Sequence, residues 1–323
     1  MTNTKRVGQP TQKKKNGFKQ QYVKELIFIF SVISVPILWW SLGFLFTTSE
    51  SIWLAFQRYD LETEGFVGNG LNNFRAVFRD IATGGVLGIC LKNSFLLWCM
   101  STFVVLPISL LISFSLYKNI YGNGFFKVIL FLPQIVSSMV WVLVFKYFVE
   151  YGIPKVFPDL YGKLSETGAS LDLLMNPKTN LATLMFYQLW LTLASGMIIY
   201  TGAMSRIPPG LVEAGKLDGM NNMQEFICIT LPLMFPTLSV TLTTCVIGIF
   251  TASLPTYQFF DSGSTTPEHL WTFGHYSFSK VMKGTSADYP MVSAISFVVT
   301  MLAAPVTLFI RWLLEKFGPE TEY

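Results

Sequence analysis

Six long apolar stretches limit the possible folds of this chain more than any motif does. A helix that crosses a bilayer needs about 20 mainly apolar residues. The six stretches run Leu26–Phe46, Phe95–Leu116, Phe126–Phe148, Leu181–Tyr200, Leu233–Leu254 and Met291–Leu314. Of the 323 residues, 51% are hydrophobic and 13% charged, and the mean hydropathy is +0.47, unlike an ordinary water-soluble domain. The sequence therefore predicts an all-α, polytopic membrane protein with six transmembrane helices.

The distribution of charge predicts the orientation of these spans, because loops rich in Lys and Arg stay in the cytoplasm. Residues 1–24 form a basic tail, and the loop after the second span has Lys118 and Lys127 but no acid. Acids collect in the loops of the opposite face: Glu50, Asp60, Glu62, Glu64, Asp80, Asp159, Glu166, Asp172, Asp261, Glu268 and Asp288. We expect both termini in the cytoplasm and no nucleic-acid partner, since the net charge of +4 reflects membrane topology.

A cleavable signal peptide is the alternative interpretation of the first stretch. The apolar core of such a peptide is about 7–15 residues long and ends in small residues. Here the run is longer and continues through Pro36, Trp39, Trp40 and Phe44. The sequence favours an uncleaved first span.

Motifs for catalysis, nucleotide binding or metal binding are not found in the sequence. The cysteines Cys90, Cys99, Cys228 and Cys245 have no metal-ligand spacing, and His269 and His275 lack neighbouring ligands. No G-x-x-x-x-G-K-[ST] occurs. We expect no catalytic residue, no metal and no bound cofactor, so another subunit must supply energy for any uphill transport.

The polar passage between the fourth and fifth spans, residues 202–231, predicts two short helices. Pro208-Pro209 suits the start of a helix, and Asp218-Gly219 ends it because Gly adopts the left-handed conformation without a steric penalty. Asn221-Asn222 can cap the second helix, which leads into the fifth span at Pro232. An ordinary structured loop would show the same signals.

The spacing of residues in this passage resembles the EAA loop of bacterial ABC importer permeases, in particular the carbohydrate branch of maltose-type, binding-protein-dependent permeases. The matching positions are Glu213, Ala214, Gly215, Asp218, Gly219, Ile229, Leu231 and Pro232. The resemblance continues at Phe66-Val67-Gly68, Asn73-Phe74 and Phe131-Leu132-Pro133, and so covers most of the chain. Gly215 stands where the family usually has Ala, which we expect to add only flexibility. The segment Asp261–Pro267 replaces the Gly-Gly-Pro of many carbohydrate permeases, so family details of that loop are not transferred.

The resemblance implies a type I ABC importer permease fold, with residues 25–323 as the permease domain, in the bacterial cytoplasmic (inner) membrane. The eight matching loop residues would couple this chain to cytoplasmic ATPase subunits, whose closure on ATP and Mg would move the spans. The implied partners are a second homologous permease, two ATPase subunits, an extracellular or periplasmic solute-binding protein, membrane lipid and a carbohydrate substrate.

Polar residues inside the spans predict the substrate path, because such residues are costly in lipid unless they face a cavity or a neighbour. Gln134, Ser138 and Trp141 share the helical spacing i, i+4, i+7, and Gln188, Thr192 and Ser195 repeat it. Thr244 and Cys245 lie on a comparable face of the fifth span, with Thr241 and Gly248. Polar packing between helices remains the other interpretation of all these positions.

Three alternatives to a sugar importer remain. The same mechanism could carry another polar solute, such as glycerol phosphate or an acidic oligosaccharide. A self-contained secondary carrier would need intramembrane acids, and no span has a central Asp or Glu. A membrane enzyme would need a catalytic cluster, which the sequence lacks. The absence of Lys and Arg from the middle of the spans favours a neutral solute.

Overall fold

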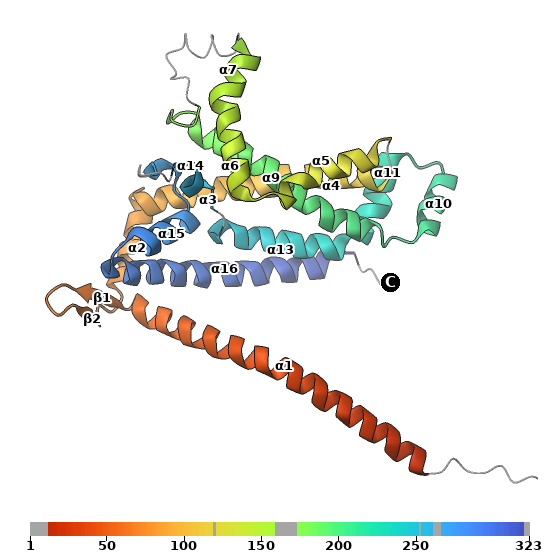
Figure 1. The fold of residues 1–323 in the computed structure, drawn as a ribbon, viewed down its shortest axis with the longest axis horizontal. Helices are drawn as coiled ribbons and strands as arrows, with labels where there is room; N and C mark the ends of the chain where they lie inside the picture. Colours follow the sequence, from red (N-terminus) through yellow and green to blue (C-terminus); the bar gives the residue numbers. More distant parts are fainter. Residues whose placement is uncertain (1–11, 119–120, 159–172, 252, 261–265, 320–323) are drawn as a thin grey trace, which may run out of the picture. The chain divides into compact units, whose positions relative to one another are not determined.

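The computed structural model describes residues 12–118, 121–158, 173–251, 253–260 and 266–319 (Figure 1). The chain divides into two compact units, residues 1–54 and 55–323. The first unit contains the helix α1 (Gln12–Ala55) except for its last residue, and this helix continues through Pro36. Its large apolar side chains from Leu26 to Trp53 are all exposed, as expected for a helix that lipid or another subunit surrounds. Because α1 begins at Gln12, part of the predicted basic tail is helical, while Lys5 and Arg6 lie outside the described residues.

The second unit is helical except for one two-stranded antiparallel hairpin among its described residues. In chain order its elements are β1 (Gln57–Asp60), β2 (Gly65–Gly68), α2 (Asn72–Ala82), α3 (Val86–Met100), η1 (Ser101–Val105), α4 (Leu106–Tyr117), α5 (Asn123–Ile135), α6 (Ser138–Tyr147), η2 (Phe148–Gly152), α7 (Ile153–Val156), α9 (Asn180–Met204), α10 (Pro209–Leu217), α11 (Asn222–Glu225), η3 (Phe226–Thr230), α12 (Leu231–Leu233), α13 (Phe235–Thr251), α14 (Thr256–Phe260), η4 (Glu268–Leu270), α15 (Phe273–Lys283), η5 (Ser286–Asp288) and α16 (Tyr289–Phe317).

The apolar helices confirm the predicted membrane architecture. Four unbroken helices among the described residues are long and apolar enough to cross a bilayer: Lys24–Ala55, Val86–Tyr117, Asn180–Met204 and Ser286–Phe317. Two further pairs of helices pass the same test together but are bent, α5 with α6–α7 by 105° and α11–α12 with α13 by 75°. Counting each bent pair as one span gives the six spans expected from the sequence.

The third span is therefore not the straight helix that the sequence predicted. Pro133 lies inside α5 and has no N–H for the helical ladder. Val136 is extended, with ψ 143°, and Ser137 has ψ 137°, so the helix restarts at Ser138 in a new direction. Gln134 consequently lies on a different helix from Ser138 and Trp141.

Each of the three π-helical segments in the described residues ends two residues before a proline. Segments η1, η2 and η3 end at Val105, Gly152 and Thr230, and the prolines are Pro107, Pro154 and Pro232. A proline removes the hydrogen bond to the residue four positions earlier and clashes with its carbonyl. A local widening of the helix before the proline relieves that clash, which explains the three segments.

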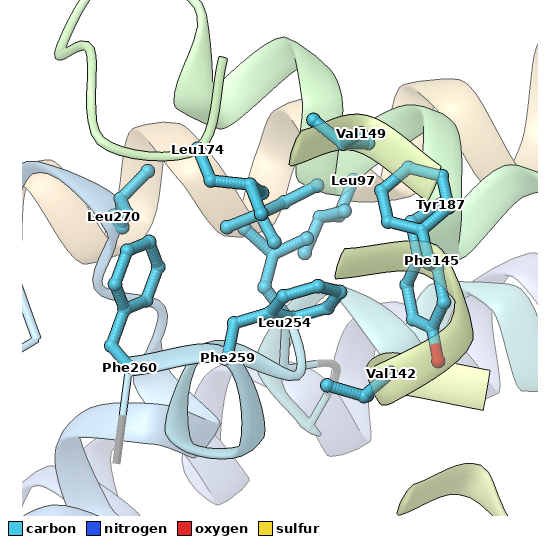
Figure 2. Close-up of a cluster of buried hydrophobic side chains, with 11 residues drawn as sticks. Leu97, Val142, Phe145, Val149, Leu174, Tyr187, Leu254, Phe259, Phe260 and Leu270 are labelled. Carbon is cyan, nitrogen blue, oxygen red and sulfur yellow. The ribbon is translucent and has the colours of Figure 1, made fainter. Parts of the chain in front are cut away.

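Within the second unit, α4 packs on α9, and α13 packs on α3 and α16. The largest buried apolar cluster joins α3, α6, α9 and α14 through Leu97, Phe145, Tyr187 and Phe259 (Figure 2). Figure 1 shows α2, α14 and α15 at one end of α16 and the helices α10 and α11 at the other. The loop that resembles a coupling element thus lies at one end of the helical bundle of the second unit.

Candidate functional site

The loop between α9 and α13 forms the two helices that the sequence predicted. Pro208 precedes the first turn of α10, and Asp218 follows its last residue. Gly219 has φ +81°, the left-handed conformation in which a side chain is strained. Its N–H donates to the carbonyl of Lys216 over 3.1 Å, and the N–H of Met220 donates to that of Gly215 over 3.0 Å. These bonds satisfy the last carbonyls of α10 and reverse the chain toward α11.

The exposed face of α10 holds most of the predicted coupling residues of this helix. Glu213, Ala214 and Asp218 are exposed, whereas Gly215 is buried. Leu217 is 89% exposed on the same helix. An isolated charged and apolar surface of this kind is typical of a docking helix, because apolar side chains on it gain free energy only when a partner covers them.

The buried face of α10 rests on η3. A β-carbon added to Gly215 would lie 2.8 Å from Cδ1 of Ile229 and 3.2 Å from Sδ of Met220. The expectation that Gly215 only adds flexibility is therefore wrong, since the glycine permits close packing inside the loop. Leu231 packs against the apolar cluster beyond it, and Pro232 lies in the first turn of α12.

The second loop helix is fixed to the end of α4. The side chain of Asn221 accepts from the N–H of Gln224 over 2.8 Å, and the side chain of Gln224 accepts from the N–H of Asn221 over 2.9 Å. The ring of Phe226 lies 5.0 Å from that of Phe114 on α4. Lys118 forms an ion pair with Glu225. Glu225 was not among the predicted site residues, although a lone acid beside an apolar run indicates a buried partner.

Four of the predicted substrate-path residues line one cavity. Thr192 and Ser195 of α9 and Thr244 and Cys245 of α13 border a space of about 300 Å³. Other lining residues come from α3, η1, α4, α9 and α13, including Ser101, Ser109, Tyr200, Thr241 and Gly248. None of the lining side chains is charged. The contribution of the second span was missed, although its serines at multiples of four residues, Ser101, Ser109 and Ser113, indicated a polar face.

The other four predicted path residues lie outside this cavity. Gln188 is half-buried and donates to Oγ1 of Thr192 over 3.3 Å. Gln134 and Ser138 are exposed, and Nε2 of Gln134 donates to the carbonyl of Leu191 over 3.2 Å. Trp141 borders a separate space of about 260 Å³, with its ring 4.9 Å from that of Trp190. The single face expected on the third span does not form, because the helix breaks between Gln134 and Ser138.

Hydroxyl groups around the cavity offer hydrogen-bond acceptors. Thr192 donates to the carbonyl of Gln188 over 2.7 Å, Ser195 to that of Thr192 over 2.8 Å, and Thr244 to that of Val240 over 2.9 Å. A hydroxyl has one donor and two acceptor lone pairs, so these three retain acceptor capacity. The arrangement suits a solute that brings hydroxyl donors of its own.

Part of this polar surface packs helices together, which is the alternative role for polar residues inside the spans. Oγ of Ser109 donates to the carbonyl of Leu193 over 3.3 Å, across the contact between α4 and α9. A β-carbon on Gly196 would lie 3.3 Å from Cβ of Ser109. Such contacts let helices approach closely in lipid, at about 0.6 kcal/mol for each hydrogen bond.

The chain is similar to permease subunits of ABC transporters over most of its length. It is 24% identical over 286 residues to the multiple sugar-binding transport system permease protein MsmF of Streptococcus mutans, covering 88% of this chain and 93% of that protein. No family model matches the chain.

Its fold is similar to two crystal structures. The first is of a bacterial ABC transporter involved in the import of the acidic polysaccharide alginate, with a TM-score of 0.69 and 20% identity over 95% of this chain and 99% of that one. The second is of a bacterial alginate ABC transporter in complex with an alginate pentasaccharide-bound periplasmic protein, with a TM-score of 0.67 and 20% identity over 91% and 94%. In sequence over most of its length and in fold, the chain is therefore similar to permease subunits of bacterial ABC transporters, and its apolar helices identify it as a membrane-embedded transporter subunit rather than an enzyme.

Proposed function

We propose that this chain forms half of the translocation pathway of an ATP-driven importer for a neutral sugar or oligosaccharide in the bacterial cytoplasmic membrane. The observation that carries the proposal is the joint at one end of the bundle. There α10 exposes Glu213 and Leu217, while its buried face rests on η3, which continues into α13. A push on α10 therefore acts on a span that lines the cavity.

The exposed face of α10 would dock on a cytoplasmic ATPase subunit. Glu213 supplies a charge for a basic or polar partner group, and Ala214 allows close approach. ATP and Mg would be used by two such subunits, and this chain would bind neither. Rigid-body rocking of the spans would then alternate access to the cavity.

The chemistry of the cavity supports a neutral cargo. Its lining offers Ser and Thr acceptors and the apolar surface of Trp98 and Tyr200, but no cation. Hydroxyl acceptors match sugar hydroxyls, and an aromatic ring covers the apolar face of a sugar. A glycerol phosphate or an acidic oligosaccharide would need positive charge in this lining or from a second permease, so such cargo is the second candidate.

Two further partners follow from the size and surface of this chain. Six spans supply too little surface to enclose a pathway, and α6 exposes Met139, Val140 and Leu143, which a second permease or lipid would cover. A solute-binding protein would deliver the cargo from outside; a protein of that kind is bound in the alginate transporter complex.

The same arrangement supports both termini in the cytoplasm. Lys118 follows the second span and contacts the α10–α11 loop through Glu225, so the basic loop and the docking helix share one end of the bundle. The Lys/Arg bias favours the cytoplasm for that end.

The cargo is tested with a purified solute-binding protein that supports uptake by the complete transporter. Calorimetry should show binding of neutral di-, tri- or tetrasaccharides, and vesicles that contain the complete transporter should accumulate the same sugar when ATP is supplied inside. Binding and uptake of uronic-acid oligosaccharides or glycerol phosphate alone would replace the neutral cargo by an anionic one. Uptake by this chain alone, without ATP, would favour a secondary carrier.

A further inference from the structure

An ion pair fixes the α10–α11 loop to a span with which the loop has no direct chain connection. Glu225 is the last residue of α11, and Lys118 directly follows α4. The Glu225 side chain is 3% exposed and that of Lys118 is 18% exposed, and Nζ of Lys118 donates to Oε2 of Glu225. The two residues are 107 positions apart in the chain. Between described residues, the other ion pairs join positions no more than eight apart.

Two contacts with the ring of Phe114 strengthen this attachment. Phe226, the neighbour of Glu225, packs its ring 5.0 Å from that of Phe114, one turn before Lys118. Nζ of Lys118 lies 5.6 Å from the centre of the same Phe114 ring, within range of a cation–π contact. Two consecutive loop residues therefore hold the last turn of α4.

Stability alone is a poor explanation for this pair. Burying two opposite charges often stabilises a fold no more than apolar residues of the same volume would. Oε1 of Glu225 is also buried, with no hydrogen-bond partner among the described residues. What the pair does provide is a specific, directional link, since the Glu225 carboxylate, 3% exposed, would be left buried and unpaired if Lys118 moved away.

The link completes a path from the docking helix to the cavity wall. The loop continues along the chain into α9 on one side and into η3, α12 and α13 on the other, whereas α4 reaches it only through side chains. Leu106 and Ser109 of α4 line the cavity. Besides the packing of α4 on α9, the ion pair attaches the end of α4 directly to the loop, so motion of the loop also acts on this part of the wall.

We propose that Lys118 and Glu225 are positioning residues that transmit the displacement of α10 to α4, so that the second span moves with α9 and α13. The inference rests on the proposed function, because it requires an ATPase that moves α10. Substrate touches neither residue. The pair makes α10 and the part of the cavity wall formed by α4 move together during each transport cycle.

The test uses the complete transporter in sealed vesicles and measures two rates, uptake of the labelled neutral sugar that the binding protein binds and hydrolysis of ATP. The informative variants are Lys118→Met with Glu225→Gln, which removes both charges, and Lys118→Glu with Glu225→Lys, which exchanges them. The matched control is Lys146→Met with Glu150→Gln, which neutralises an i, i+4 ion pair on α6 and η2.

We expect the doubly neutral variant to fold and hydrolyse ATP, while its ratio of uptake to hydrolysis falls about tenfold, as for a typical coupling free energy. The exchanged pair should recover part of that ratio, and the control should keep it unchanged. A doubly neutral variant with the wild-type ratio would overturn the inference and leave the pair only a structural role. Lack of ATP-driven uptake in the wild-type complex would instead refute the proposed function.

Discussion

A β-carbon on Gly215 would lie 2.8 Å from Cδ1 of Ile229, so a glycine at this position marks the contact between α10 and η3. The two residues come from opposite sides of the turn at Gly219. Their contact explains in physical terms why a small residue and a branched apolar residue are spaced as they are in the loop. The helix α10 therefore packs directly against η3, the segment that leads into α13.

The first prediction concerns this contact. Gly215→Leu should overpack the joint, destabilise the protein by about 1–3 kcal/mol and reduce uptake per ATP. Gly215→Ala should be milder, because Cδ1 of Ile229 is the end of a flexible side chain and Ala favours a helix over Gly by about 1 kcal/mol. The measurement is the thermal unfolding midpoint together with the uptake-to-hydrolysis ratio.

Replacing Ile229 supplies the control for this pair. Ile229→Val removes Cδ1, so the double variant Gly215→Ala with Ile229→Val should unfold at a higher temperature than the sum of the single effects predicts. Strict additivity of the two changes would show that the residues do not press on one another.

The second prediction concerns the turn after α10. A β-carbon added to Gly219 would meet free space, but the residue has a φ of +81°, so substitution costs backbone strain and not a clash. Gly219→Ala should destabilise by about 1–2 kcal/mol, and Asn should cost less because it tolerates this conformation. A bulky residue should uncouple uptake from ATP hydrolysis while membrane insertion continues.

Gly210 gives a matched comparison for Gly219, because it also has free space but an ordinary φ. Gly210→Ala should not lower stability, because Ala favours a helix over Gly, and it should leave the uptake-to-hydrolysis ratio close to wild type. Near-normal uptake per ATP in a Gly219→Leu variant would remove this turn from the coupling mechanism.

The third prediction concerns the cavity acceptors. Thr192→Val and Thr244→Val remove hydroxyl oxygens from the lining, so the apparent KM for the sugar should rise while ATP hydrolysis by the complex is retained. Each hydrogen bond lost from a solute is worth about 1 kcal/mol, which corresponds to about a fivefold change. Concentration-dependent uptake in vesicles measures the effect.

Thr300 on α16 serves as the control for these threonines. Its hydroxyl donates to the carbonyl of Ser296 over 2.8 Å, as in the cavity threonines, but it is not among the residues that line the cavity. Thr300→Val should leave KM unchanged. Equal effects at Thr192, Thr244 and Thr300 would assign them all to helix packing.

The fourth prediction is a loss of stability in acid through His275 on α15. This side chain is 4% exposed, and its Nδ1 lies 2.8 Å from Oγ1 of Thr256. Burial, with a smaller effect of the charge on Lys283, lowers the pKa of His275 from its ordinary value of 6.5. The unfolded chain then takes up a proton at a pH where the folded chain does not. The stability is fully present above pH 6.5 and falls as the pH decreases toward the folded pKa.

Thermal unfolding at several pH values on both sides of 6.5 tests whether stability falls in acid as predicted. His275→Gln should lower stability in neutral solution but flatten the decline in acid. An unfolding midpoint that falls equally in the wild type and the His275→Gln protein would show that other groups cause the acid sensitivity.

The existence and type of the spans were predictable, because about 20 apolar residues admit few other structures. The shape of the spans was harder to predict than their existence. Pro133 signalled a disturbance in the third span, but the extended residues Val136 and Ser137 that produce the 105° bend carry no distinctive sequence signal. The loop helices were predicted closely because proline, glycine and asparagine fix their ends at Pro208, Gly219 and Asn221.

Contacts between distant segments were the least predictable part of the site. Thr192, Ser195, Thr244 and Cys245 do meet at one cavity, since helical spacing identifies a polar face. The spacing could not reveal that Ser109 of α4 joins them, or that Lys118 finds Glu225. Such pairings depend on how helices pack, which a single-segment pattern does not encode.

The most direct measurement of the central claim is ATP-dependent sugar uptake by vesicles with a defined set of subunits. The complete assembly of this chain, its partner permease, the ATPase subunits and the binding protein should accumulate the sugar only when ATP is present. The same vesicles with a Gly219→Leu chain should hydrolyse ATP but accumulate little sugar. Accumulation by this chain alone, or by the complete assembly without ATP, would contradict the account.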